Sequence, residues 1–175
     1  MKLRDEMVAG AVGGLAGGML MTAFMTGASK AGMIDETLPH KVEQYIEEQL
    51  DQQAQTGPTQ EKMLAQSGHL VYSTLLGAGY GALRATFDWS PLPSGPLCGV
   101  YLYGLNLMGV GPALGITRGP WNEQRPTVMR RMMMHAAFGA MTALVSEQVR
   151  QRMSEQTEGE PARHHLEHRA GQPVR

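Results

Sequence analysis

The hydrophobic and polar positions of the chain are separated into long blocks. Asp, Glu, Lys and Arg are absent from residues 7–29, 63–83, 89–117 and 132–146. A helix needs about 20 mainly apolar residues to cross a hydrocarbon core roughly 30 Å thick. The first three blocks reach that length, and helical continuation at both ends lengthens the fourth. The pattern predicts an all-α, four-helix transmembrane bundle with spans near 8–29, 64–84, 96–116 and 127–149.

The fourth span depends on Arg130 and Arg131, which must extend their charged ends to the interface while their stems stay in the apolar layer. Trp89 and Trp121 flank the third block, where interfacial aromatic rings tend to lie. The alternative is a water-soluble helical protein with glycine-rich hairpins. The blocks lack the polar face that a water-exposed helix needs, which favours the membrane.

The first block also resembles a signal peptide, because Lys2 and Arg4 give it a basic start. Asp5 and Glu6 follow at once, however, and the apolar stretch is longer than the usual 7–15 residues. We therefore expect an uncleaved first helix.

The polar segments predict the rest of the domain organisation. In the first loop Val42, Tyr45, Ile46 and Leu50 share one helical stripe, which indicates an amphipathic interfacial helix near 40–54. After residue 153 the chain is rich in Gln, Glu, Arg and His and has no apolar period. We expect a membrane domain over 1–153 and a mobile polar tail over 154–175.

The net charge excludes several classes of protein. Among 175 residues, 15 Lys and Arg stand against 16 Asp and Glu, a net charge of -1, so a nucleic-acid partner is not expected. Cys98 is the only cysteine, which rules out an internal disulfide and a cysteine-rich metal centre. Basic residues flanking the terminal segments favour cytoplasmic termini, although the loops on the two sides carry nearly equal numbers of Lys and Arg.

The second and fourth spans share a pattern of His, two residues, an aromatic residue and then a small residue. The pattern begins at His69 in one span and at His135 in the other, and small residues follow at intervals of four. The odd spans carry Gly-x-x-x-Gly repeats, so the chain reads as a duplicated helical hairpin, a parallel internal repeat. Small residues four apart let helices approach closely, while a pore or ligand cavity lined by them is the alternative. The predicted helix-packing residues are Gly10, Gly14, Gly18, Ser73, Gly77, Gly81 and Gly139.

His69 and His135 are the candidate functional residues. Each falls in the first third of its span, so the repeat would place both at similar depth. A polar side chain inside the bilayer is costly without a partner and is often functional. One possibility is a histidine bonded to a neighbouring carbonyl or hydroxyl, such as that of Ser73 or Thr74. The other is a facing pair that charges as the pH falls and loosens the helix contact by repulsion.

The sequence contains no recognisable catalytic apparatus, neither a nucleophile with a paired base nor a phosphate-binding loop, so we expect no enzyme and no cofactor. No metal site is expected either. Two imidazoles without a carboxylate or thiolate bind metal poorly, the adjacent Met132, Met133 and Met134 do not converge, and the tail histidines fall in the expected mobile segment.

A family resemblance adds to this reading over residues 8–149. The motifs that carry it are Leu38-Pro39-His40-Lys41, His69-x-x-Tyr72, Gly77-x-x-Tyr80-Gly81, Pro112-Ala113-Leu114-Gly115 and His135-x-x-Phe138-Gly139. In order and spacing they resemble the YagU-like family of small bacterial inner-membrane proteins. The resemblance implies a multi-span membrane protein without an assigned catalytic residue. Family members often read Pro-Pro-Arg after the first span, where this chain has Leu38-Pro39-His40-Lys41.

The sequence therefore supports three functional hypotheses. The first is a non-enzymatic inner-membrane protein, pH-responsive through its intramembrane histidines, with lipid and a second copy or another membrane protein as partners. The second is a small transporter or channel subunit. The third is an assembly partner that docks a larger membrane complex through the amphipathic segment.

Overall fold

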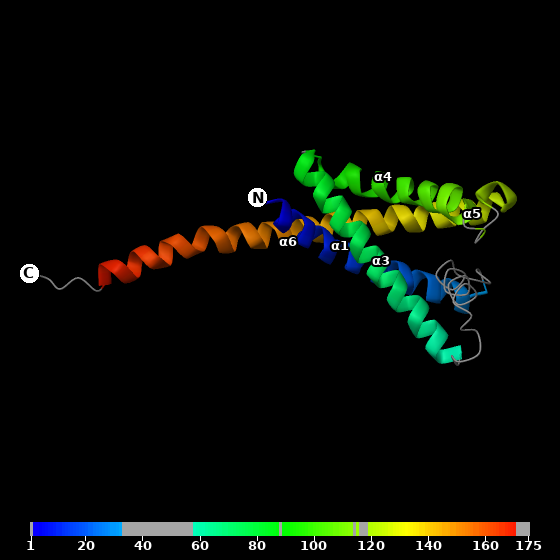
Figure 1. The fold of residues 1–175 in the computed structure, drawn as a ribbon, viewed down its shortest axis with the longest axis horizontal. Helices are drawn as coiled ribbons and strands as arrows, with labels where there is room; N and C mark the ends of the chain where they lie inside the picture. Colours follow the sequence, from blue (N-terminus) through cyan, green and yellow to red (C-terminus); the bar gives the residue numbers. More distant parts are fainter. Residues whose placement is uncertain (1, 33–57, 88, 114, 116–118, 171–175) are drawn as a thin grey trace, which may run out of the picture.

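The computed structural model describes residues 2–32, 58–87, 89–113, 115 and 119–170, and this part of the chain is helical without any strand. Four long helices make up the fold (Figure 1). The all-α class expected from the sequence is confirmed. The amphipathic helix expected near 40–54 lies outside the described residues.

The first hairpin consists of α1 (Leu3–Lys30) and α3 (Pro58–Thr86). Asp5 and Glu6 lie in the first turn of α1 and Lys30 lies in its last turn, an arrangement that complements the helix dipole. Pro58 is the first residue of α3. A backbone N–H at this position would have no partner within the helix, so proline costs no hydrogen bond there. Both helices are longer than the expected spans because their polar ends continue the helix.

The second hairpin begins with α4 (Pro91–Gly104), which continues as the π-helix η1 (Leu105–Val110) and the short α5 (Gly111–Ala113). This helical stretch starts before the expected residue 96, because Pro91 suits a first helical position and the fixed φ of proline favours the helix there. The turn η2 (Pro120–Asn122) leads into α6 (Arg125–Ala170). The last span was expected to end at residue 149, but α6 continues without a break past that position.

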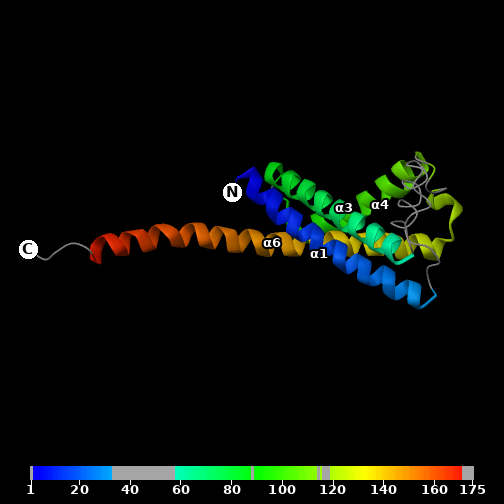
Figure 2. The same cartoon turned by 60° about the horizontal axis from the view of Figure 1, so that its bottom comes forward.

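In space α1 lies between α3 and α6, and α4 packs along α6. Figures 1 and 2 show α6 projecting far beyond the other helices, from the end of the bundle where the N-terminus lies. The mobility predicted for 154–175 stays a prediction, although the backbone is helical as far as Ala170.

The apolar core is small. Met21, Leu102 and Phe138 form its buried centre, and the partly buried residues packed against it are Met25, Leu76, Cys98 and Met134. The centre joins α1, α4 and α6. Because so few large side chains are buried, close backbone contact must supply much of the packing between helices.

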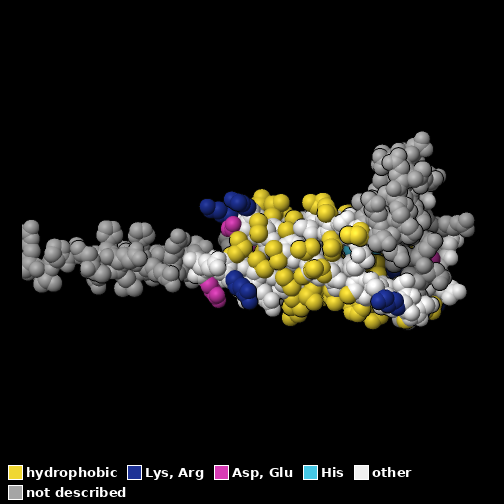
Figure 3. All heavy atoms as spheres, turned by 90° about the horizontal axis from the view of Figure 1, so that it is seen from below, with side chains coloured by type: hydrophobic (Ala, Val, Ile, Leu, Met, Phe, Trp, Pro, Cys, Tyr) yellow, Lys and Arg dark blue, Asp and Glu magenta, His cyan; other side chains and the backbone are white. Residues whose placement is uncertain are grey.

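Large hydrophobic side chains are instead widely exposed on the sides of the bundle. Those on the four long helices, which we call the apolar band, include Val8, Val12, Leu15, Met19, Val71, Leu75, Leu83, Leu97, Val100, Met133 and Leu144. Figure 3 shows hydrophobic side chains spread over the middle of one face, with charged side chains gathered at the end near the projecting helix and a smaller group of Lys or Arg side chains near the opposite end.

Within the described residues, α1 is the single helix whose length and apolar composition suffice to cross a membrane. The sequence led us to expect four such helices. Two of the others carry several polar residues within their charge-free runs, among them His69, Ser73, Thr142 and Ser146. The third, α4, has only 14 residues before its π-helical continuation.

Candidate functional site

The crossing of α1 and α3 is built on glycine. A Cβ atom added to Gly10 would collide with the backbone of Gly77 and Gly81, and one added to Gly14 would collide with the backbone of Ser73 and Gly77. Gly18 lies against the side chain of Ser73. The helices run antiparallel, so successive turns along α1 contact successively earlier turns of α3.

The crossing of α4 and α6 has the same character. Added Cβ atoms at Gly95 and Gly99 would collide with the backbone of Gly139 and of His135, respectively. On its other side α6 meets α1, where Gly17 lies against Phe138 and Thr142. The predicted packing residues therefore all lie at helix contacts, and so do Gly95 and Gly99, which form a Gly-x-x-x-Gly repeat of the third span.

This register brings four polar residues from four helices to one level. Thr22 lies one turn beyond Gly18 on α1, and His69 lies one turn before Ser73 on α3. Tyr103 lies one turn beyond Gly99 on α4, and Gly99 contacts His135 on α6. We call Thr22, His69, Tyr103 and His135 the histidine layer.

The two histidines interact within this layer. They are close enough for a charge on His135 to act on His69. The rings of Tyr103 and His135 meet edge to face, with centroids 5.3 Å apart and an interplanar angle of 68°. The Nδ1 atom of His135 lies 2.8 Å from the carbonyl oxygen of Arg131, one turn earlier on its own helix. Because a carbonyl oxygen can only accept, Nδ1 carries the proton and Nε2 is left to titrate.

Three other polar atoms of the histidine layer are buried without a hydrogen-bond partner in the described part of the chain. They are Thr22 Oγ1, His69 Nε2 and Tyr103 Oη. Tyr103 is only 3% exposed. Buried polar groups are nearly always hydrogen-bonded, so three such atoms at one level make this layer the candidate functional site.

Polar contacts flank the histidine layer towards the start of α6. The hydroxyl of Tyr72 donates to Oδ1 of Asn106 at 2.9 Å, which joins α3 to the π-helix η1. Arg131 forms an ion pair with Glu123, which follows η2. Segments of π-helix occur frequently at functional sites, and this one begins two residues after Tyr103.

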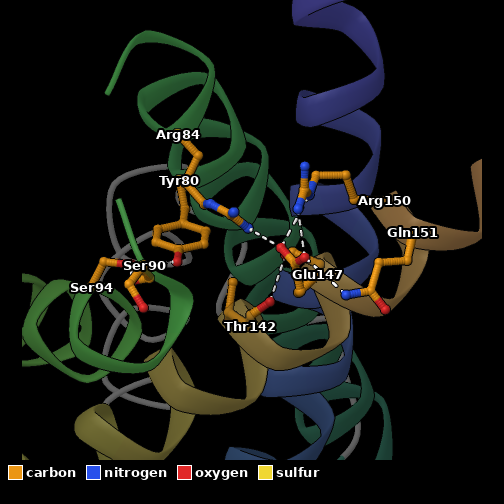
Figure 4. A network of polar contacts seen from close by, with 9 residues as sticks. Tyr80, Arg84, Ser90, Ser94, Thr142, Glu147, Arg150 and Gln151 are labelled. Atoms are coloured by element: carbon orange, nitrogen blue, oxygen red, sulfur yellow. Dashed lines mark hydrogen bonds and ion pairs between the residues drawn. The ribbon is translucent and has the colours of Figure 1, made fainter. Parts of the chain in front are cut away.

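The opposite end of the bundle holds a separate charged network, drawn in Figure 4. Arg84 of α3 and Arg150 of α6 converge on the Glu147 carboxylate, with N–O distances of 3.0 and 2.6 Å. Glu147 lies beyond the charge-free run 132–146, at the charged end. Hydrogen bonds from Arg150, and further ones from Arg84 and Gln151, lower the pKa of Glu147 from 4.5 to about 2, against its partial burial.

Sequence reasoning selected His69 and His135 but missed Thr22, Tyr103 and the Glu123–Arg131 pair. The available signal for Tyr103 was its place one turn after Gly99 in a glycine-spaced helix. Hydrogen bonds from His69 to Ser73 or Thr74 were one possibility, but the Thr74 hydroxyl instead donates to the Leu70 carbonyl at 2.7 Å.

The described residues contain no group of three or more His, Cys, Asp or Glu side chains placed to hold a metal ion. Comparisons with protein-family models, curated proteins and solved structures found no match for this chain. The arrangement of the histidine layer must therefore be interpreted from its own chemistry.

Proposed function

We propose that this chain is a multi-pass protein of the bacterial inner membrane, without enzymatic activity, that responds to pH through His69 and His135. The observation that carries the proposal is the apolar band, which lies between charged residues at both ends of the bundle. Water-soluble monomers rarely expose so much contiguous apolar surface.

The lengths of two charge-free runs support immersion of α1 and α3. At about 1.5 Å per residue, the run 7–29 rises roughly 34 Å and the run 63–83 roughly 31 Å, each enough for a hydrocarbon core. The polar residues that lower the hydropathy of α3 and α6 include Ser73, Thr142 and Ser146, which are buried between helices. Thr142 and Ser146 donate to carbonyls one turn earlier, so lipid would not meet their hydroxyls unpaired.

A lysine in the apolar band tests immersion beyond α1. Leu75 is 65% exposed on α3, and in water a lysine there would be harmless. If α3 lies in lipid, Leu75→Lys costs about 2.5–3.5 kcal/mol and sharply reduces the fraction of protein that resists alkaline extraction from membranes. Thr86→Lys, at the end of the same helix, is the matched control and should leave extraction unchanged. Full membrane retention of Leu75→Lys, or a wild-type chain monodisperse without detergent, would contradict the proposal.

The parallel between the two helix crossings supports a duplicated hairpin. Gly14 and Gly18 meet α3 near Ser73, and Gly95 and Gly99 meet α6 near the equivalent Gly139. The two halves are not fully equivalent, since α1 packs against α6 while α4 has no comparable contact with α3. The pair His69 and His135 occupies corresponding positions in this scheme. It is also the feature that supports membership of the YagU-like family.

The pH response follows from the groups that surround the histidine pair. The α1 residue of the layer, Thr22, is uncharged, as are all residues from 7 to 29. Tyr103 of α4 is neutral near pH 7. Arg131 of α6 is cationic and already paired with Glu123. Two imidazolium ions would therefore repel each other with no carboxylate between them, and the helix contact would loosen as the pH falls.

The single cysteine reports such loosening. Cys98 packs against the apolar centre of Met21, Leu102 and Phe138, one residue before Gly99. We compare the maleimide labelling rate of Cys98 in wild type with that in the His69→Gln/His135→Gln variant. The ratio of the wild-type rate to the variant rate should rise about fivefold from pH 8 to pH 5. The ratio cancels the titration of the thiol itself. Equal labelling rates in the two proteins at every pH would contradict the proposed response.

The charged end does not interfere with this measurement. Because the pKa of Glu147 is about 2, its carboxylate stays ionised between pH 8 and pH 5. The pairing of Glu147 with Arg84 and Arg150 is therefore constant over the interval in which the histidines titrate.

The transporter hypothesis is less well supported. It needs small-residue stripes that face an open path, whereas Gly10, Gly14, Gly77 and Gly81 face neighbouring backbone. The assembly hypothesis depends on the amphipathic segment near 40–54, outside the described residues. Self-association remains part of the proposal, with the exposed apolar band as its available surface.

A further inference from the structure

Arg131 connects the histidine layer to the loop before α6. Its carbonyl oxygen accepts a hydrogen bond from Nδ1 of His135, and its guanidinium forms the ion pair with Glu123. Both contacts come from one residue, a single helical turn from His135. A positive charge there opposes the protonation of His135 unless another group neutralises it.

Glu123 is placed to neutralise that charge. One of its oxygens, Oε1, is held by Arg131, and the other, Oε2, is buried without a hydrogen-bond partner in the described part of the chain. The side chain as a whole is 27% exposed. Tyr103 lies close enough to interact electrostatically with both Glu123 and Arg131.

We propose that Glu123 is the counter-ion that sets the pH at which His135 becomes charged, acting through Arg131. The groups facing His135 are His69 from α3, Tyr103 from α4 and Arg131 from its own helix, while α1 contributes the uncharged Thr22. Within the described residues, Glu123 is the only carboxylate that an ion pair links to one of these groups, Arg131. Glu123 is thus a positioning residue for the proposed pH response, on which the inference rests.

The test follows the imidazole ¹⁵N resonances of the full-length protein in detergent micelles from pH 8 to pH 4. The His135 signal is assigned by its loss in His135→Gln. In Glu123→Gln we expect the His135 midpoint to fall by about half a pH unit or more, because Arg131 is left unneutralised. Glu155→Gln, an exposed carboxylate on α6 far from the layer, is the matched control and should leave the midpoint in place.

Two further variants separate an electrostatic effect from damage to the fold. Glu123→Asp keeps the charge and should restore most of the wild-type midpoint. In an Arg131→Gln background the Glu123 carboxylate is no longer held beside α6, so removal of its charge should have a much smaller effect. A His135 midpoint that is the same in wild type and Glu123→Gln, or that falls equally in Glu123→Asp, overturns the role of Glu123 alone. A wild-type His135 that stays neutral down to pH 4 overturns the proposed pH response as well.

Discussion

Replacing Gly77 by leucine is expected to separate α1 from α3 and to cost about 3 kcal/mol of stability. A Cβ atom at this position collides with backbone atoms of Gly10 and Gly14, and the backbone cannot move aside as a flexible side chain can. For a chain of this size the melting temperature in detergent should fall by roughly 6–12 °C. Scanning fluorimetry of the purified protein, using the intrinsic Trp89 and Trp121, gives this value directly.

Gly79 supplies the control for this prediction on the same helix. A Cβ atom added to Gly79 meets nothing within 4 Å. Gly79→Leu should therefore leave the melting temperature unchanged or raise it slightly, since leucine favours the helix by up to about 1 kcal/mol over glycine. Equal losses in Gly77→Leu and Gly79→Leu would mean that glycine serves helix flexibility here, and the packing explanation would fail.

The stripes of small residues allowed the helix contacts to be predicted with useful accuracy. Gly10, Gly14 and Gly18 repeat every four positions on α1, and Gly77 and Gly81 do the same on α3. Residues at that spacing lie on one face of a helix, so the contact face follows from the spacing alone. The partner of each face does not follow, because any small-residue stripe could meet any other.

The histidine layer illustrates where sequence reasoning ended. The repeat placed His69 and His135 at similar depth, but the contributions of Thr22 and Tyr103 depend on which turn of α1 and of α4 meets them. That register is set by contacts across four helices. Glu123 is far from His135 in the chain, and its link to the layer through Arg131 requires the turn η2 to fold back against α6.

The helix boundaries were missed for local reasons. Charges mark where the apolar layer ends, but a helix continues through polar residues as long as they favour the helical backbone. For this reason α6 extends to Ala170 and α3 begins at Pro58, well outside the charge-free runs. The third span was expected to begin at residue 96, although α4 begins at Pro91, because proline suits the first turn of a helix.

Removal of the Glu147 carboxylate is the second substitution with a large expected effect. Arg84 is only 8% exposed and donates to Glu147 from a different helix, so Glu147→Leu leaves a buried cation without its partner. Such a loss typically costs about 3–5 kcal/mol. Leucine at both positions, in Arg84→Leu/Glu147→Leu, removes the buried charge as well and should recover most of the stability. Arg150→Leu, which removes the more exposed partner, should cost less than about 1 kcal/mol.

The pH dependence of this penalty identifies its electrostatic origin. The folded-state pKa of Glu147 is lowered to about 2 from an ordinary 4.5, so the ion pair stabilises the fold fully above pH 4.5. Its contribution is lost as the pH falls from 4.5 towards 2, where the folded protein also takes up the proton. The gap in melting temperature between wild type and Glu147→Leu should therefore stay constant from pH 8 to pH 5 and narrow below pH 4. A gap that does not change down to pH 2, or a double variant as unstable as Glu147→Leu, would show that Glu147 acts through packing and not through its charge.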